Sequence, residues 1–259
     1  MSLWSRLLAH PLTAGRALDD VQTTVLRRRV IASKPFLQQL YREWYQTLAA
    51  SLPPGAGRVL EIGSGAGFLR EVVPDLITSD VQPLPGVERT LDAEQLPFAA
   101  GELKAILMID VLHHLRQPAR FLEEAARVVR PGGIVGMIEP WVTPWSRLVY
   151  AHLHPEPFDP EASWEVDGDG PLSRANGALP WILFARDRDR FARQEREWTI
   201  ATIRPLMPVA YLLAGGVSLR LSLPGQSYPL VRRLERLLGR ATEKTAMFAH
   251  IVLERSAPR

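Results

Sequence analysis

The chain has no cysteine among its 259 residues. This absence excludes disulfides, thiolate metal sites and cysteine nucleophiles, and it says little about the compartment. A membrane-spanning helix needs roughly 20 apolar residues in a row, and the most apolar stretch, 206–219, is shorter and is interrupted by Pro208 and Gly215-Gly216. Residues 3–12 lack the pattern of a secretory signal peptide. We therefore expect a cytoplasmic protein.

A large excess of charge of either sign is also missing. The 31 Lys and Arg residues exceed the 28 Asp and Glu residues only slightly, and the formal net charge is +3. Basic residues cluster locally at Arg27-Arg28-Arg29 and Arg232-Arg233. Such clusters can meet phosphates or anionic lipid, although a solvated helix face is their commoner explanation. Peripheral contact with a membrane stays open, and no long basic tract indicates nucleic-acid binding.

Apolar residues make up 46% of the chain, and most of them fall into short strand and helix patterns. Buried or alternating runs predict strands at 58–62, 76–79, 105–109, 134–138, 217–223 and 246–254. Apolar spacings of three and four predict helices at 35–52, 68–73, 120–129 and 228–238. Strands that alternate with helices are typical of a parallel sheet with crossover connections.

Two regions stand apart from this alternation. Residues 1–52 are predicted to form a helical flank or lid that ends at Pro53-Pro54-Gly55, ahead of a main domain at 53–259. Residues 141–204 interrupt the alternation and contain five of the seven tryptophans, which predicts an insertion after the fifth strand. Its aromatic residues either line a pocket or pack as core. They are Trp141, Trp145, Tyr150, Phe158, Trp164, Trp181 and Phe184.

The segment 59–67 (VLEIGSGAG) carries the most informative pattern. A strand leads into three alternate glycines, which permit a tight turn and let a ligand approach the backbone closely. Free N–H groups at the start of a following helix would favour an anionic group. A dinucleotide fingerprint has the spacing GxGxxG, so the alternate positions of Gly63, Gly65 and Gly67 disfavour a nicotinamide-dependent oxidoreductase.

With Glu61 in front of the glycines, the pattern E-x-G-x-G-x-G resembles the first motif of class I S-adenosylmethionine (SAM)-dependent methyltransferases. Further elements follow in the family's order: Asp80 at the end of the second strand, 92–98 (DAEQLPF), 109–115 (IDVLHHL) and 128–133 (VVRPGG). The resemblance implies a Rossmann-like α/β fold with a mixed seven-stranded sheet and helices on both faces. It also implies SAM as the cofactor.

The resemblance places SAM along these motifs. Asp80 would accept hydrogen bonds from the ribose hydroxyls, Asp92 would meet the adenine amino group, and Glu61 would lie near the methionyl end. Each also has a structural interpretation, as a turn cap, a turn residue or an acceptor for backbone N–H groups, and Asp110 has the weakest case. The predicted cofactor-binding residues are Glu61, Gly63, Ser64, Gly65, Gly67, Phe68, Asp80, Val81, Asp92, Ala93, Ile109 and Asp110.

The sequence departs from the family's pattern at two places. Only 11 residues separate Asp80 from Asp92, and Pro83 and Pro85 are among them. The usual helix between those strands has little room, so we expect a loop there. Lys104 stands where the family often has an aspartate, a position that we expect to be structural.

Methyl transfer from a sulfonium is an in-line displacement that requires alignment with the acceptor, and a hydroxyl or acidic carbon acceptor also needs a base. His114, His113 and Glu139 follow the fourth and fifth strands, where the family places its acceptor site, and they are the candidate catalytic residues. His152 and His154 have a spacing that some metal sites use, but no third ligand is evident, so we predict no metal site.

Several functions fit these observations. The segments 141–154 and 175–181 resemble uncharacterised bacterial methyltransferases associated with glycan or lipid-linked glycan assembly. This resemblance favours transfer to oxygen or carbon of a small-molecule, glycan or lipid-linked acceptor. A non-catalytic SAM-binding protein or membrane-surface scaffold is an alternative. A nucleic-acid methyltransferase is disfavoured, because residues 110–113 (DVLH) replace the Asn/Asp-Pro-Pro-Tyr motif used for exocyclic amines. The sequence does not predict an oligomeric state.

Overall fold

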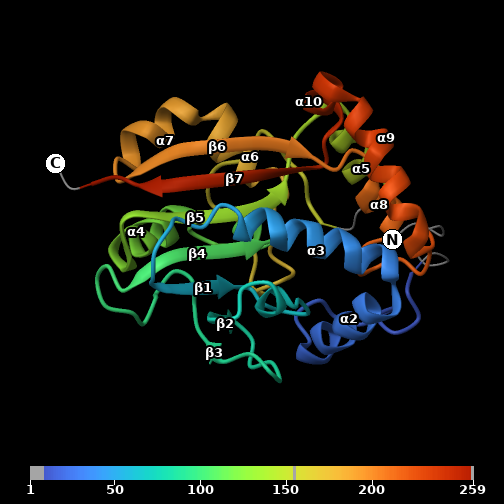
Figure 1. Ribbon diagram of the computed structural model, residues 1–259, viewed down its shortest axis with the longest axis horizontal. Coiled ribbons are helices and arrows are strands. Elements are labelled where there is room, and N and C mark those ends of the chain that lie inside the picture. Colours follow the sequence, from blue (N-terminus) through green and yellow to red (C-terminus); the bar gives the residue numbers. More distant parts are fainter. Residues whose placement is uncertain (1–8, 154–155, 258–259) are drawn as a thin grey trace.

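A seven-stranded sheet forms the centre of the computed structural model, which describes residues 9–153 and 156–257 (Figure 1). The strand order is β3-β2-β1-β4-β5-β7-β6. The strands are β1 Arg58–Ile62, β2 Leu76–Asp80, β3 Arg89–Thr90, β4 Leu103–Ile109, β5 Val129–Pro140, β6 Trp198–Leu206 and β7 Phe248–Arg255. Strands β1 to β5 pair in parallel, and β7 runs antiparallel to β5 and β6. The predicted mixed seven-stranded sheet is confirmed.

Helices cover both faces of this sheet (Figure 1). The α-helices are α2 Val21–Ser33, α3 Pro35–Ala49, α4 Pro118–Val128, α5 Pro144–Leu153, α6 Leu179–Trp181, α7 Arg188–Gln194, α8 Ala210–Ala214, α9 Tyr228–Leu237 and α10 Thr242–Thr245. Alternate residues of β4 enter different cores: Ile106 and Met108 pack with α4, α6 and α7, whereas Ala105 and Leu107 pack with α3, α5 and α8. Within the described parts of the chain, no helix combines the length and the apolar character needed to cross a membrane.

Helix α3 contributes six buried side chains to the core that contains Ala105 and Leu107. Its apolar side chains recur at spacings of three and four, and Pro35 stands at its first turn, where a missing N–H costs nothing. The side chains that it buries are Phe36, Leu37, Leu40, Trp44, Tyr45 and Leu48. The predicted helix at 35–52 is therefore confirmed, although it ends at Ala49.

Two predicted elements are wrong. The sixth strand is β6, at 198–206, which overlaps the end of the predicted insertion, whereas 217–223 makes only an isolated bridge between Leu219 and Ala9. Gly215 and Gly216 both have positive φ and turn the chain away from the sheet there. The predicted helix at 68–73 is a single 3₁₀ turn, Leu69–Glu71, because Pro74 leaves too few residues for a stable α-helix.

The remaining predictions of elements agree with the structure or need small changes. Helices α4 and α9 and the final strand β7 lie where the sequence predicts them. The segment between Asp80 and Asp92 has no helix, as expected, but it contains the two-residue edge strand β3, which the sequence analysis missed. Lys104 donates a hydrogen bond to the Gly55 carbonyl at 2.9 Å, which agrees with a structural role.

Candidate functional site

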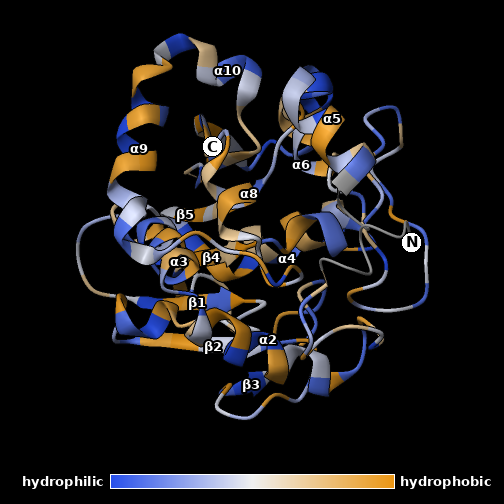
Figure 2. Ribbon diagram, turned by 90° about the vertical axis from the view of Figure 1, so that its right-hand side faces the viewer, coloured by the Kyte–Doolittle hydropathy of each residue, from blue (hydrophilic) through white to orange (hydrophobic). Residues whose placement is uncertain are grey.

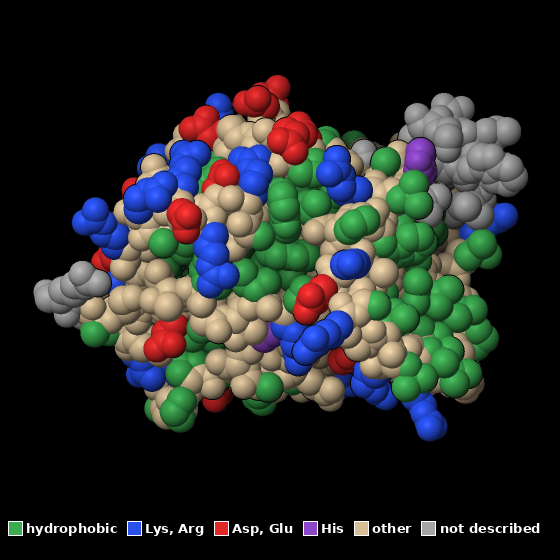
Figure 3. All heavy atoms as spheres, turned by 90° about the horizontal axis from the view of Figure 1, so that it is seen from above, with side chains coloured by type: hydrophobic (Ala, Val, Ile, Leu, Met, Phe, Trp, Pro, Cys, Tyr) green, Lys and Arg blue, Asp and Glu red, His purple; other side chains and the backbone are tan. Residues whose placement is uncertain are grey.

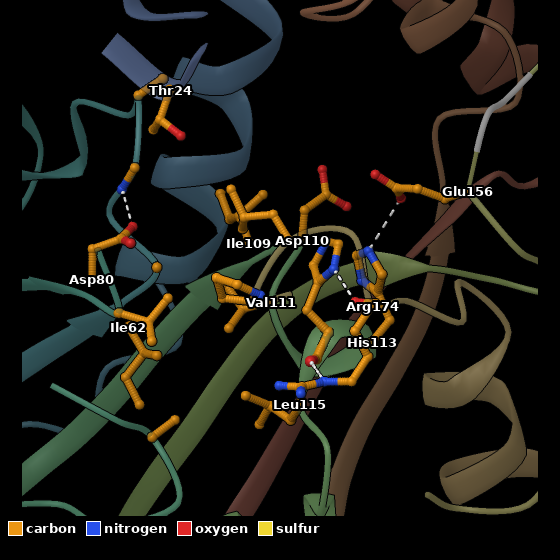
Figure 4. A pocket seen from close by; sticks show the side chains of 18 of the residues that line it. Thr24, Ile62, Asp80, Ile109, Asp110, Val111, His113, Leu115, Glu156 and Arg174 are labelled. Atoms are coloured by element: carbon orange, nitrogen blue, oxygen red, sulfur yellow. Dashed lines mark hydrogen bonds and ion pairs between the residues drawn. The ribbon is translucent and has the colours of Figure 1, made fainter. Parts of the chain in front are cut away.

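A cavity of about 460 Å³ opens beyond the carboxyl ends of β1, β2, β4 and β5 (Figure 4). This edge of an open α/β sheet is where ligands commonly bind. Eight predicted cofactor-binding residues line the cavity: Gly63, Gly65, Asp80, Val81, Asp92, Ala93, Ile109 and Asp110. The structure therefore brings four separate sequence motifs together at one opening.

The glycine-rich loop closes onto the end of β2. Gly63 and Gly65 have φ of +68° and +44°, a region that glycine adopts without strain. A Cβ on Gly63 would come within 2.3 Å of the Val111 side chain, so this position has no room for a larger residue. The N–H of Gly65 donates to Asp80 Oδ2 at 3.0 Å, which fixes the distance between the loop and the second strand.

Asp80 is a buried carboxylate with a defined orientation. Its Oδ1 accepts a hydrogen bond from the Gln82 N–H at 2.9 Å, while its Oδ2 accepts the one from Gly65. Burial raises the pKa of Asp80, and the backbone donors counteract part of that shift. Each carboxylate oxygen can accept more than one hydrogen bond, so the group retains capacity to accept hydroxyls of a ligand in the cavity.

Four predicted cofactor residues lie outside the cavity lining: Glu61, Ser64, Gly67 and Phe68. Ser64 Oγ donates to Glu61 Oε2 at 2.7 Å and accepts from the Ser79 N–H at 3.1 Å. Burial raises the pKa of Glu61 to about 7. These contacts support the loop from behind, and direct contact of these four residues with a cofactor stays a prediction.

Asp92 stabilises a turn and also lines the cavity. Its Oδ1 accepts a hydrogen bond from the Glu94 N–H at 2.9 Å, as in an Asx turn. Its carboxyl group also lines the cavity. The structural and the functional interpretation of Asp92 are therefore compatible.

His113 is held between two carboxylates. Its Nδ1–H donates to Glu139 Oε2 at 2.7 Å. Its Nε2 lies 3.6 Å from Glu156 Oε2 (Figure 4). Burial alone would lower the pKa of His113, but the hydrogen bond and charge of Glu139, assisted by Glu156, raise it to about 10. His113 is therefore a buried imidazolium at neutral pH and cannot accept a proton there.

Both carboxylate oxygens of Glu139 are engaged in hydrogen bonds in this arrangement. Its Oε1 accepts hydrogen bonds from the N–H groups of Val111 and Leu112, both at 2.8 Å, while its Oε2 accepts from His113. The side chain is fully buried and is not part of the cavity lining. Glu139 therefore orients the chain after β4 and the His113 ring.

His114 is in a different state from its neighbour. Its Nδ1 lies 2.8 Å from the Arg174 carbonyl oxygen, so Nδ1 carries the proton and donates. Burial, together with the positive charge on His113, lowers the pKa of His114 to about 4. His114 is therefore neutral at physiological pH, and its Nε2 retains a lone pair at the cavity lining.

Asp110 has a strained backbone and a carboxyl group in the cavity. Its φ is +55°, a conformation that Asp adopts more readily than most residues other than glycine. Figure 4 shows the carboxyl group turned into the open part of the cavity. Burial, and next the repulsion from Glu139 and Glu156, raise the pKa of Asp110 to about 7 against the attraction of His113.

Two sets of side chains near His113 have the composition of metal ligands. The sets are His113, His114 and Glu156, and Asp110, His113 and Glu139, each with ligand atoms within 4.8 Å of one another. His113 belongs to both sets, and its two nitrogens face the two glutamates with a proton on the ring. A protonated imidazole has no lone pair to offer a metal. His152 is exposed, and His154 lies outside the described residues.

The N-terminal region covers the cavity. Thr24 and Arg27 of α2 line it, and Gln82 Nε2 donates to the Asp19 carbonyl at 2.7 Å. Asp19 Oδ1 accepts hydrogen bonds from the Leu172 and Ser173 N–H groups at 2.7 and 3.0 Å. The region ahead of β1 therefore meets the region after β5 beside the cavity, and its role as a lid stays a prediction.

An aromatic group that the sequence analysis missed forms another part of the lining. The group comprises Tyr41 from α3, Tyr211 from α8 and Phe248 from β7, and Tyr150 of the insertion joins it. The only sequence signal for Tyr41 is the amphipathic spacing of α3. That spacing predicts a core residue, and it does not predict a cavity residue. These four rings give the part of the cavity away from Asp80 an apolar character.

Most insertion aromatics are core instead. Trp141, Trp164 and Phe184 are buried in the core under α4, and Trp181 packs against it. Trp145 donates its indole N–H to the Pro208 carbonyl at 2.8 Å. Phe158 stacks on Tyr150 with ring centroids 4.3 Å apart. Of the seven insertion aromatics, for which the sequence leaves pocket lining and core both open, only Tyr150 lines the cavity.

Comparison with known proteins identifies the domain that carries this site. Residues 60–137 match the family model described as a methyltransferase domain. An uncharacterized methyltransferase of Mycobacterium tuberculosis is 35% identical over 111 residues, which cover 38% of this chain and 44% of the relative. The phthiotriol/phenolphthiotriol dimycocerosates methyltransferase of Mycobacterium leprae is 32% identical over 141 residues, which cover 48% and 47%. The chain thus spans about half the length of these curated relatives.

The fold comparison covers nearly the whole chain. The crystal structure of geranyl diphosphate C-methyltransferase from Streptomyces coelicolor matches with a TM-score of 0.53 at 14% sequence identity, over 96% of this chain and 91% of that one. At this identity the match concerns the fold alone. Together with the strand order, it shows the Rossmann-like class I methyltransferase fold that the sequence predicts, and residues 60–137 carry the matched methyltransferase domain.

Proposed function

We propose that this protein transfers a methyl group from SAM to an oxygen or carbon atom of a small-molecule, glycan or lipid-linked acceptor. The observation that carries the proposal is a single cavity shared by two sets of groups. Asp80 and the glycine-rich loop lie at one side, and Asp110, His114 and an aromatic lining lie at the other. Such an arrangement can hold a cofactor and an acceptor in line with each other.

The cofactor side has the chemistry that SAM requires. The Asp80 carboxylate can accept the ribose hydroxyls, and the glycine-rich loop lets the amino-acid end of a ligand approach the backbone. The walls formed by Val81, Ala93 and Ile109 suit a flat adenine ring. When bound, SAM supplies the electrophilic methyl group on its sulfonium.

Asp110 and His114 are the candidates for removing a proton from the acceptor. Both line the cavity and both can accept a proton there. A pKa of about 7 suits a general base at neutral pH better than a pKa of about 4, which favours Asp110. In this proposal His113 and Glu139 are positioning residues: their ion pair fixes the turn that presents both candidate bases.

Binding is tested first, by isothermal titration calorimetry and thermal unfolding with SAM, S-adenosylhomocysteine and NAD. We expect both adenosyl compounds to bind and to raise the melting temperature, because a ligand of the native state stabilises it by mass action. NAD should do neither. An equal shift with NAD, or a shift with NAD alone, would contradict the cofactor assignment.

Catalysis is tested with methyl-labelled SAM and extracts of a strain that lacks this protein, because acceptors there should be undermethylated. The extracts are separated into lipid, glycan, small-molecule and nucleic-acid fractions. Label that enters any of the first three fractions supports the proposal. Label confined to nucleic acid contradicts it. SAM binding without label in any fraction would favour the alternative of a non-catalytic SAM-binding or scaffold protein.

A further inference from the structure

Helix α9 presents leucines to solvent and two charged side chains, Arg232 and Glu235, to the protein. Leu230, Leu234 and Leu237 recur at helical spacing, and their exposed fractions are 60%, 56% and 76%. Glu235 lies on the opposite side and is 4% exposed. It accepts hydrogen bonds of 2.7 Å from the two N–H groups at the start of α8. This orientation is the reverse of an ordinary surface helix.

Ion pairs fix that orientation. Arg232, on the inner side of α9, donates to Glu43 of α3 at 2.6 Å and also pairs with Glu235. Tyr228 at the start of α9 donates to the same glutamate, Glu43, at 2.6 Å. The helix is therefore attached to the protein through buried polar contacts, and its leucines take no part in that attachment.

The exposed apolar surface continues beyond α9. Helix α8 packs beside it and adds Leu213, which is 37% exposed, and the segment after α8 adds Leu221 and Leu223, which are 60% and 36% exposed. A backbone hydrogen bond of 2.9 Å joins Leu223 to Leu213. Figure 2 shows α9 at the edge of the molecule, and Figure 3 shows a broad area of hydrophobic side chains at the end where Figure 1 places α8 and α9. We name these six leucines of α8, α9 and the segment between them the leucine face.

The charges around the leucine face are almost all positive. Between residues 209 and 245, the exposed charged residues are Arg220, Arg233, Arg236, Arg240 and Lys244, against the single acid Glu243. An apolar surface rimmed by basic side chains complements a bilayer that contains anionic lipid. A second copy of the chain would bring the same cations together, so the charge pattern disfavours self-association through this face.

The leucine face adjoins the cavity. The segment that carries Leu213 and Leu221 also contributes Tyr211, Val217 and Ser218 to the cavity lining. We propose that the leucine face docks on an anionic membrane surface and so brings the cavity close to the bilayer. Insofar as the proposed methyl transfer holds, docking places a lipid-soluble acceptor within reach of the site, so this part rests on the proposed function.

Docking is tested by vesicle flotation of the full chain without SAM. The vesicles contain phosphatidylcholine alone or with about a third phosphatidylglycerol. We expect flotation with the anionic vesicles at low salt, and its loss at high salt, because screening weakens surface attraction. Replacing Leu230, Leu234 and Leu237 together by Gln should lower the partition coefficient about 100-fold, since three apolar side chains no longer enter the interface.

Two variants make the test specific. Leu148→Gln removes an exposed leucine (54% exposed) of α5 that is outside the leucine face, and it should float like the unchanged protein. Arg233→Gln with Arg236→Gln should weaken flotation roughly 10-fold or more, because each basic residue near an anionic surface adds about a factor of five. Circular dichroism and SAM calorimetry on every variant separate a docking defect from misfolding or loss of the cofactor site.

Three results would overturn the proposal. They are no flotation of the unchanged protein at low salt, equal flotation of the triple leucine variant, or a dimer in sedimentation that the triple variant converts to monomer. None of these results bears on cofactor binding. Conversely, a protein that floats but does not bind SAM would leave membrane docking intact and contradict the proposed function.

Discussion

At the scale of single residues, Asp80 carries the cofactor assignment. Its two oxygens hold the glycine-rich loop and the start of the next segment. Replacing Asp80 by Ala should raise the dissociation constant for SAM roughly 10- to 100-fold, the effect of losing a charged hydrogen-bond acceptor. Calorimetry measures it. Asp75→Ala, at an exposed acid just ahead of the same strand, is the matched control, and unchanged affinity in Asp80→Ala would mean that the ribose assignment is wrong.

Asp110 makes a prediction about the pH dependence of the rate. If its carboxylate is the base, kcat/KM should rise with pH and level off above its pKa of about 7. Asp110→Asn keeps the size of the side chain and tolerates the positive φ, and it should lower kcat by 100-fold or more, a usual contribution of general-base catalysis. A rate that is flat from pH 5.5 upward in the unchanged protein would instead point to His114, whose pKa is about 4.

The same substitution makes a prediction about stability. The pKa of Asp110 is raised from 3.8 to about 7 in the folded protein, so the folded state binds this proton more tightly than the unfolded state. The stability linked to Asp110 is therefore full below pH 4 and is lost as pH rises through 7. Asn is neutral at every pH, so Asp110→Asn should gain unfolding free energy relative to the unchanged protein as pH rises from about 4 to about 7. Urea titrations at pH 4, 6 and 8 measure this gain, and a constant difference would contradict the raised pKa.

At the scale of elements, α3 and the glycine-rich loop depend on each other. The Phe68 N–H donates to the Tyr45 hydroxyl at 3.1 Å, and a Cβ on Gly67 would come within 2.5 Å of that hydroxyl oxygen. Gly67→Ala should therefore reduce both stability and SAM affinity. Tyr45→Phe removes the oxygen that the new methyl group would meet, so Gly67→Ala should cost less in that background.

A double-mutant cycle measures this coupling. The unfolding free energies and SAM dissociation constants of the four proteins should give a coupling of about 1 kcal/mol or more between residues in contact. Additive effects would contradict the proposed dependence. They would mean that Gly67 is required for another reason, such as its 3.0 Å approach to the Ser64 carbonyl.

The elements that the sequence predicts correctly are those whose pattern is local. Strands β1, β2 and β4 are short apolar runs that end at acids, and the residue periodicities of α3, α4 and α9 specify their helices. Strand β6 was assigned to the insertion because its outer edge position leaves all but one of its residues partly or fully exposed, without a clear apolar run. The glycine-rich motif led to the expectation of a helix at 68–73, whereas Pro74 limits that segment to one turn.

The same distinction applies to the site: residues in local sequence motifs were predicted, and features that depend on distant segments were not. Motif residues such as Gly63, Asp80 and Asp92 converge as the sequence predicts, because each ends a strand of one parallel sheet or follows it closely. The protonation of His113 and His114 could not be predicted, because it depends on Glu139, Glu156 and Arg174 from distant segments. Three of the four rings of the aromatic lining were missed for a related reason: Tyr41, Tyr211 and Phe248 come from α3, α8 and β7, outside the predicted insertion that contains Tyr150.

At the scale of the whole molecule, the sequence pattern changes at the boundary expected at residue 52. Side chains from both sides of that boundary nevertheless pack together in one core. The apolar face of α3 lies in the same core as β1, β4 and β5, and α2 reaches the cavity and the glycine-rich loop: Arg28 donates to the Gly65 carbonyl at 3.0 Å. The segment ahead of β1 therefore serves both as a wall of the fold and as a cover of the site.

This packing predicts the outcome of a truncation. Six side chains of α3 are almost fully buried, and each contributes roughly 2 kcal/mol by leaving water. Their sum is about as large as the whole unfolding free energy of an ordinary domain. A chain that begins at residue 53 should therefore lack a cooperative urea transition and should not bind SAM. A chain that begins at residue 18, just ahead of α2, should keep both properties. A cooperative transition of the shorter chain at unchanged midpoint would show that residues 53–259 form an independent domain and that α3 is an appendage.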